Sequence, residues 1–66
     1  MESPLMTAKE VAMIMDCSER YAYMIIRKIN DEMATEGFIT RPGRVSRKRF
    51  YERTGLEMPE ELNKPN

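Results

Sequence analysis

The hydrophobic positions near the start of the chain recur at helical spacing. A capping box opens this stretch: Thr7 can accept a hydrogen bond from the third helical amide, and Glu10 can reach back to the amide of Thr7. The pattern predicts a short helix over residues 7–15. Its apolar stripe is formed by Ala8, Val11, Ala12 and Met15.

A second and longer helix is predicted over residues 18–35, after a tight turn at Asp16 and Cys17. Aspartate tolerates the left-handed conformation that such a turn requires. Ser18 is a good N-cap residue, and Gly37 is a good left-handed stop. The buried stripe of this helix is predicted to be Ala22, Ile25, Ile26, Ile29 and Met33.

Residues 38–46 have the pattern of a small β-hairpin. The β-branched and aromatic run 38–40 predicts one strand, Pro42 and Gly43 predict the turn, and Val45 predicts the return strand. Ser46 then caps a last short helix, with Phe50 as its apolar anchor.

These elements predict one domain over residues 7–53. Residues 1–6 are interpreted as a flexible arm and residues 54–66 as a flexible tail. Two helices joined by so short a turn must cross at a large angle, which is the geometry of a helix-turn-helix. The predicted fold class is mainly α with a small β-hairpin wing, a winged helix-turn-helix.

Length and composition exclude several kinds of protein. With 66 residues the chain holds one small core, and with one Cys and no His it lacks disulfides, imidazole zinc ligands and His-based acid–base catalysis. We expect no enzyme activity, cofactor, metal or small-molecule substrate. No apolar run approaches the roughly 20 residues of a membrane span, and no signal peptide is recognisable, so a cytoplasmic protein without a membrane partner is expected.

The formal net charge is zero, but the charge is unevenly distributed. Residues 1–37 have a net charge of −3 and residues 54–66 a net charge of −2, whereas residues 38–53 have a net charge of +5. A concentrated basic segment on a neutral chain is suited to local recognition of anions such as DNA phosphates.

Several short motifs occur in a suggestive order: TAKEVA at 7–12, MDCSER at 15–20, FIT at 38–40 and GRVSR at 43–47. Together they resemble the excisionase-type, MerR-like winged helix-turn-helix proteins of phages and integrative mobile elements. The resemblance covers about residues 5–53. It implies DNA binding, with the second helix in the major groove and the wing on the backbone or minor groove. Members of the family usually have glycine where this chain has Asp16.

On this interpretation two groups of side chains contact double-stranded DNA. Tyr23 is assigned instead to the edge of the core, and the role of Tyr51 is left open between core packing and DNA contact. The contacts from the second helix are predicted to be Ser18, Arg20, Tyr21, Met24, Arg27 and Lys28. Those from the wing and the following segment are predicted to be Arg41, Arg44, Arg47, Lys48 and Arg49. For Arg49 and Arg53, pairing with Glu52 and Glu57 is the alternative to a place in the DNA footprint.

The expected function is sequence-specific DNA binding, either as an excisionase-like recombination directionality factor or as a small transcriptional regulator of a mobile element. Expected partners besides DNA are an integrase or recombinase and further copies of the chain side by side on DNA. The alternative is a protein-interaction module that docks on a recombinase or transcription component without binding DNA itself. RNA binding is disfavoured, because RNA modules usually need exposed aromatic platforms and this chain has few aromatic residues.

Overall fold

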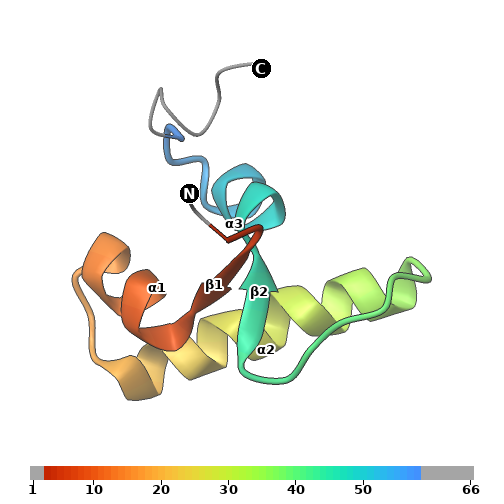
Figure 1. The fold of residues 1–66 in the computed structure, drawn as a ribbon, viewed down its shortest axis with the longest axis horizontal. Helices are drawn as coiled ribbons and strands as arrows, with labels where there is room; N and C mark the ends of the chain where they lie inside the picture. Colours follow the sequence, from red (N-terminus) through yellow and green to blue (C-terminus); the bar gives the residue numbers. More distant parts are fainter. Residues whose placement is uncertain (1–2, 59–66) are drawn as a thin grey trace.

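The computed structural model describes residues 3–58, which form three helices and a two-stranded antiparallel sheet (Figure 1). The predicted fold class, mainly helical with a small two-stranded sheet, is confirmed. The elements in chain order are β1 (Leu5–Thr7), α1 (Ala8–Met15), α2 (Glu19–Thr35), β2 (Arg44–Ser46) and α3 (Arg47–Thr54).

Helix α1 begins as the sequence predicted. The amide of Glu10 donates to the Thr7 hydroxyl over 3.1 Å, and the amide of Thr7 donates to the Glu10 carboxylate over 3.1 Å. The helix ends at Asp16, which adopts the left-handed conformation with φ of 53°. Asp16 therefore makes the tight turn that the sequence predicts.

Helix α2 is capped at both ends. The Ser18 hydroxyl accepts a hydrogen bond from the amide of Tyr21 over 3.1 Å. At the other end Gly37 has a φ of 95°, and the amides of Gly37 and Phe38 donate to the carbonyls of Ala34 and Met33. This pair of bonds is a Schellman motif, which satisfies carbonyls that the last helical turn leaves open.

The sheet differs from the predicted hairpin. Strand β2 pairs with β1, so that Val45 lies opposite Met6, and residues 38–40 form no strand. The predicted pairing of β2 with residues 38–40 was therefore wrong. The prediction of a flexible arm over residues 1–6 was also wrong for residues 5 and 6, which belong to β1. Met6 and Val45 are both fully buried, whereas Ile39 is 99% exposed. Pairing with β1 buries two apolar side chains against the helices, which pairing with residues 38–40 would not achieve.

Helix α3 follows directly after β2 and packs Phe50 and Tyr51 into the core. Ser46 accepts from the amide of Arg49 over 3.1 Å, Phe50 is fully buried, and the ring of Phe50 meets that of Tyr51 edge-on. The expected tail begins within this helix, and its residues 59–66 lie outside the described part. The buried core consists of Met6, Ala8, Val11, Ala12, Ala22, Ile26, Ile29, Val45, Phe50 and Tyr51.

Candidate nucleic-acid interface

One side of α2 faces the loop that leads into β2. Successive helical residues are rotated by about 100°, so Arg20, Tyr23 and Arg27 share one ridge of the helix. Tyr23 and Arg27 line a groove whose opposite wall is the loop, including Gly43. The middle of α2 and the loop thus belong to one surface.

Asn30 fixes the position of this loop. Its side-chain amide is buried and donates to the carbonyls of Arg41 and Arg44, over 3.1 and 2.7 Å. The amide of Arg44 also donates to the carbonyl of Arg41 over 3.1 Å, which closes a tight turn over Pro42 and Gly43. Both ends of the turn are therefore tied to α2 through a single side chain.

The groove between α2 and the loop has a volume of about 440 Å³. It combines hydroxyl, guanidinium, carboxylate and apolar groups. We call it the α2–loop groove. Its lining residues are Tyr23, Ile26, Arg27, Asn30, Asp31, Thr40, Pro42 and Gly43.

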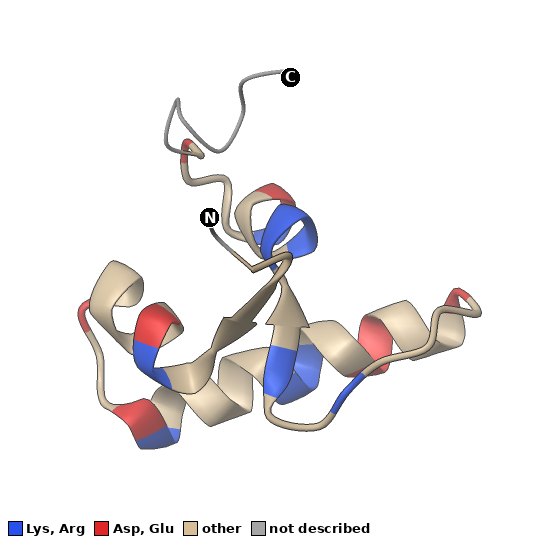
Figure 2. Ribbon diagram, in the orientation of Figure 1, with Lys and Arg blue, Asp and Glu red and all other residues tan. Residues whose placement is uncertain are grey.

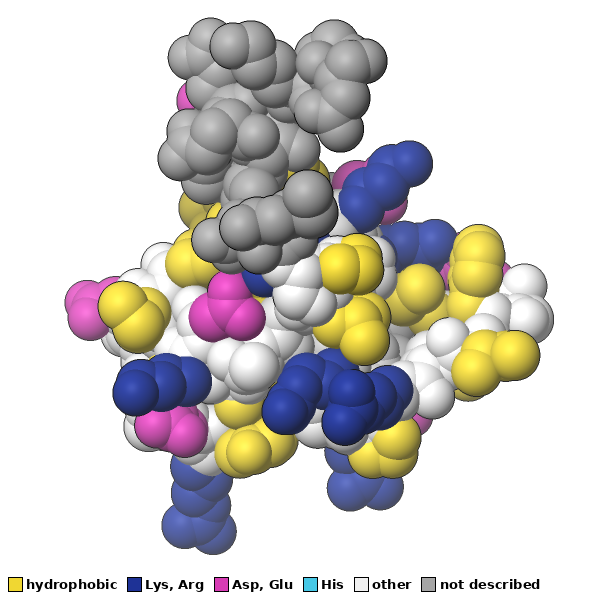
Figure 3. All heavy atoms as spheres, in the orientation of Figure 1, with side chains coloured by type: hydrophobic (Ala, Val, Ile, Leu, Met, Phe, Trp, Pro, Cys, Tyr) yellow, Lys and Arg dark blue, Asp and Glu magenta, His cyan; other side chains and the backbone are white. Residues whose placement is uncertain are grey.

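Four arginines lie in or near this region: Arg27 lines the groove, Arg41 and Arg44 line a second pocket beside the loop, and Arg20 stands about two turns before Arg27 on α2. Within residues 3–58, none of them forms an ion pair with an acid. Figure 2 shows the basic segments of α2, the loop and the start of β2 close together, and Figure 3 shows basic side chains gathered over the same region. Cations without acidic partners leave their charge available to an external anion.

Arg47 does not belong to this surface. It is 7% exposed, and its guanidinium donates to the Ser3 carbonyl over 2.8 Å and pairs with Glu10 over 3.0 Å. The hydrogen bond from the Thr7 amide is the largest cause of a lowered pKa of the Glu10 carboxyl, and the pairing with Arg47 lowers it further. The expectation that Arg47 contacts DNA is therefore not supported: a buried, paired guanidinium stabilises the fold instead.

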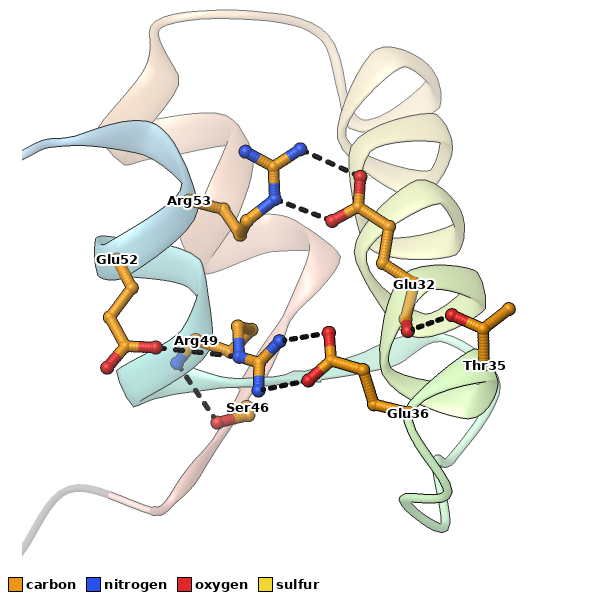
Figure 4. A network of polar contacts seen from close by, with 7 residues as sticks. All are labelled: Glu32, Thr35, Glu36, Ser46, Arg49, Glu52 and Arg53. Atoms are coloured by element: carbon orange, nitrogen blue, oxygen red, sulfur yellow. Dashed lines mark hydrogen bonds and ion pairs between the residues drawn. The ribbon is translucent and has the colours of Figure 1, made fainter.

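Arg49 and Arg53 tie α3 to α2 (Figure 4). Arg49 makes two hydrogen bonds to the carboxylate of Glu36, over 2.9 and 3.2 Å, and Arg53 binds Glu32 in the same forked manner. These bonds lower the pKa of both carboxyl groups. Arg49 also pairs with Glu52 over 3.5 Å, one of the pairings that the sequence offered, but its main partner Glu36 was not foreseen.

The remaining predicted contacts are spread more widely. Ser18 and Met24 are exposed at the front and on the outer face of α2. Tyr21 and Lys28 lie on the flank of α2 away from the loop. Glu32 on this flank binds Arg53 of α3, and the charge of Lys28 adds to the effect of Arg53 in lowering the pKa of Glu32. Lys48 is exposed in the first turn of α3. Strand β2 separates this turn from the loop.

Sequence reasoning missed two residues of this surface. Tyr23, which was assigned to the edge of the core, is 51% exposed and also lines the groove, whereas Tyr51, whose role was left open, is 8% exposed. Asn30 carried a usable signal, because it is a polar residue inside the helix at a position next to the buried stripe. A polar amide there needs partners.

Comparison with known proteins identifies the family. No protein-family model matches the chain, and no solved structure matches it. Among curated proteins, it is similar to the ICEBs1 excisionase of Bacillus subtilis (strain 168), with 35% identity over 52 residues. The match covers 79% of this chain and 81% of that protein. The chain belongs to the excisionases of mobile elements.

This membership decides the class of activity. Excisionases are recombination directionality factors and not enzymes, which confirms the expectation from composition and from the resemblance. None of the helices within residues 3–58 is long and apolar enough to cross a membrane.

Proposed function

We propose that this excisionase binds double-stranded DNA sequence-specifically through the surface framed by Arg20, Arg27, Arg41 and Arg44. The N-terminal end of α2 enters a major groove, and the loop lies on the neighbouring sugar–phosphate backbone. The observation that carries the proposal is that, among residues 3–58, these four arginines have no acidic partner, while Arg47, Arg49 and Arg53 are held in ion pairs.

The two parts of the surface have different tasks. Arg20 lies in the first turn of α2, where a side chain can reach the edges of the bases, and arginine donates two bonds to guanine. Arg41 and Arg44 flank a turn of fixed geometry, which suits them to phosphates. Phosphate contacts supply affinity for any duplex, and base contacts supply the preference for a site.

The proposed partner besides DNA is the integrase of the same mobile element, which performs the cutting and joining. The excisionase contributes binding beside the attachment site and no chemistry. The competing proposal, a module that docks on the recombinase without binding DNA, has one supporting feature: Met13 on α1 is 75% exposed, on the segment with a net negative charge.

Salt dependence of binding separates the two proposals. A duplex selected from random DNA is titrated with the protein by fluorescence anisotropy between 50 and 200 mM salt, conditions in which the phosphate term changes strongly. Four phosphate contacts predict a slope of about −4 for log K against log salt, and about −3 if Arg20 contacts a base instead.

Arg53→Ala is the matched control, since it removes an arginine that is already paired with Glu32. It leaves the slope unchanged, whereas Arg41→Ala and Arg44→Ala each reduce the slope by about 1. A wild-type chain whose weak binding hardly responds to salt would instead support the docking module.

A further inference from the structure

The α2–loop groove is lined by hydroxyl side chains as well as by arginine. Tyr23 and Arg27 form its helix wall, and Thr40 and Gly43 form part of its loop wall. Within residues 3–58 neither the Tyr23 nor the Thr40 hydroxyl takes part in a hydrogen bond. Both walls therefore offer hydroxyl donors to whatever occupies the groove.

The geometry of the proposed DNA complex defines the occupant. The major groove is bordered on each side by a sugar–phosphate strand. A helix inside that groove and a loop on the neighbouring backbone must straddle one of these strands. That strand would lie over the groove between α2 and the loop and would not pass through it, because the Tyr23 ring lies against Gly43 across the groove.

We propose that the α2–loop groove seats one sugar–phosphate strand of the duplex, with the Tyr23 and Thr40 hydroxyls donating to its phosphate oxygens from opposite walls. The inference rests on the proposed function and assigns two contact residues that the arginine surface does not include. Tyrosine and threonine hydroxyls, like arginine, are common donors to DNA phosphates. Arg27 supplies positive charge along the same wall.

Asn30 sets the width of this seat. It is anchored on α2 and holds the carbonyls of Arg41 and Arg44, at the two ends of the turn, with hydrogen bonds of 3.1 and 2.7 Å. The loop wall therefore stands at a fixed distance from the helix wall before DNA arrives. A preformed seat avoids the entropic cost of ordering a loop on binding.

Asp31 gives the inference its sharpest consequence. It is the one acid among the residues that line the groove. A phosphate in the groove would be repelled by this carboxylate, so removing the charge should strengthen binding to any duplex. If the groove lies away from DNA, the same change should act no more strongly than removal of a distant acid.

The experiment measures affinity for the selected duplex with four variants. Tyr23→Phe and Thr40→Val each remove a hydroxyl at nearly constant volume, and each should weaken binding about tenfold, as expected for a hydrogen bond to a charged group. Asp31→Asn should strengthen binding about fivefold. Glu57→Gln, an exposed acid beyond α3, is its control and should change affinity by less than about twofold. Circular dichroism verifies that each variant is folded.

The outcomes distinguish this inference from the proposed function. If Arg44→Ala weakens binding while Tyr23→Phe, Thr40→Val and Asp31→Asn all bind like the wild type, the DNA surface stands and the strand seat is wrong. If Asp31→Asn and Glu57→Gln strengthen binding equally, the effect is one of net charge and the seat is again wrong. If the wild type shows no salt-dependent binding, both proposals fail.

Discussion

Glu10 and Arg47, which are 37 residues apart in sequence, form an ion pair of 3.0 Å between Oε2 and Nη2. The same carboxylate receives the backbone amide of Thr7, so the capping box of α1 and the start of α3 share one acid. Arg47 also donates to the Ser3 carbonyl and so holds the segment that leads into β1. One pair of side chains thus connects β1, α1 and α3.

Arg47→Ala should lower the free energy of unfolding by about 3 kcal/mol, because it removes a buried guanidinium and leaves its acceptors without a donor. The measurement is urea unfolding followed by circular dichroism. Arg53→Ala breaks an exposed pair and should cost much less. Equal losses for the two variants would contradict the structural role assigned to Arg47.

Acid should destabilise the protein partly through Glu10. Its pKa in the folded state lies below the ordinary value of 4.5, so the folded chain binds fewer protons than the unfolded chain in this range. The resulting stability is fully present above pH 4.5 and is lost as the pH falls through the lowered pKa. Glu10→Gln should therefore flatten the decline in the free energy of unfolding as the pH falls below about 4.5. The measurement is urea unfolding at each pH. A Glu10→Gln variant with the wild-type pH profile would refute this assignment.

Asn30→Asp should release the loop from α2. The carboxylate would face the carbonyl oxygens of Arg41 and Arg44, which need a donor, at a cost of about 1–3 kcal/mol in unfolding free energy. DNA affinity should fall as well, because the two loop arginines lose their position. In an Arg41→Ala, Arg44→Ala background the same change should have little further effect on affinity. An undiminished loss in that background would mean that Asn30 acts on the fold alone.

Arg20→Ala and Arg44→Ala should weaken DNA binding in different ways. Loss of Arg20 should blur the preference at one base position by about 1–3 kcal/mol, and loss of Arg44 should weaken binding to all duplexes alike. Selection of bound sites from random DNA with each variant measures the difference. Equal losses of discrimination would contradict the division between base and phosphate contacts.

The helices and their ends could be predicted from the sequence because their causes are local. The capping box of Thr7 and Glu10, the Ser18 cap and the left-handed turns at Asp16 and Gly37 each depend on residues within a few positions of one another. The apolar stripes likewise depend only on helical spacing. The motif order was also sufficient to indicate the excisionase family.

The partner of β2 and the roles of the cations were decided by tertiary structure alone. Residues 5–7 and 38–40 are both short apolar-containing segments, and only the three-dimensional packing makes Met6 the partner that buries Val45. Similarly, Arg44 and Arg47 stand three positions apart in one basic run, yet one borders the candidate DNA surface and the other is buried beside Glu10. A charge run does not specify which of its members meet an acid, because that acid lies far away in sequence.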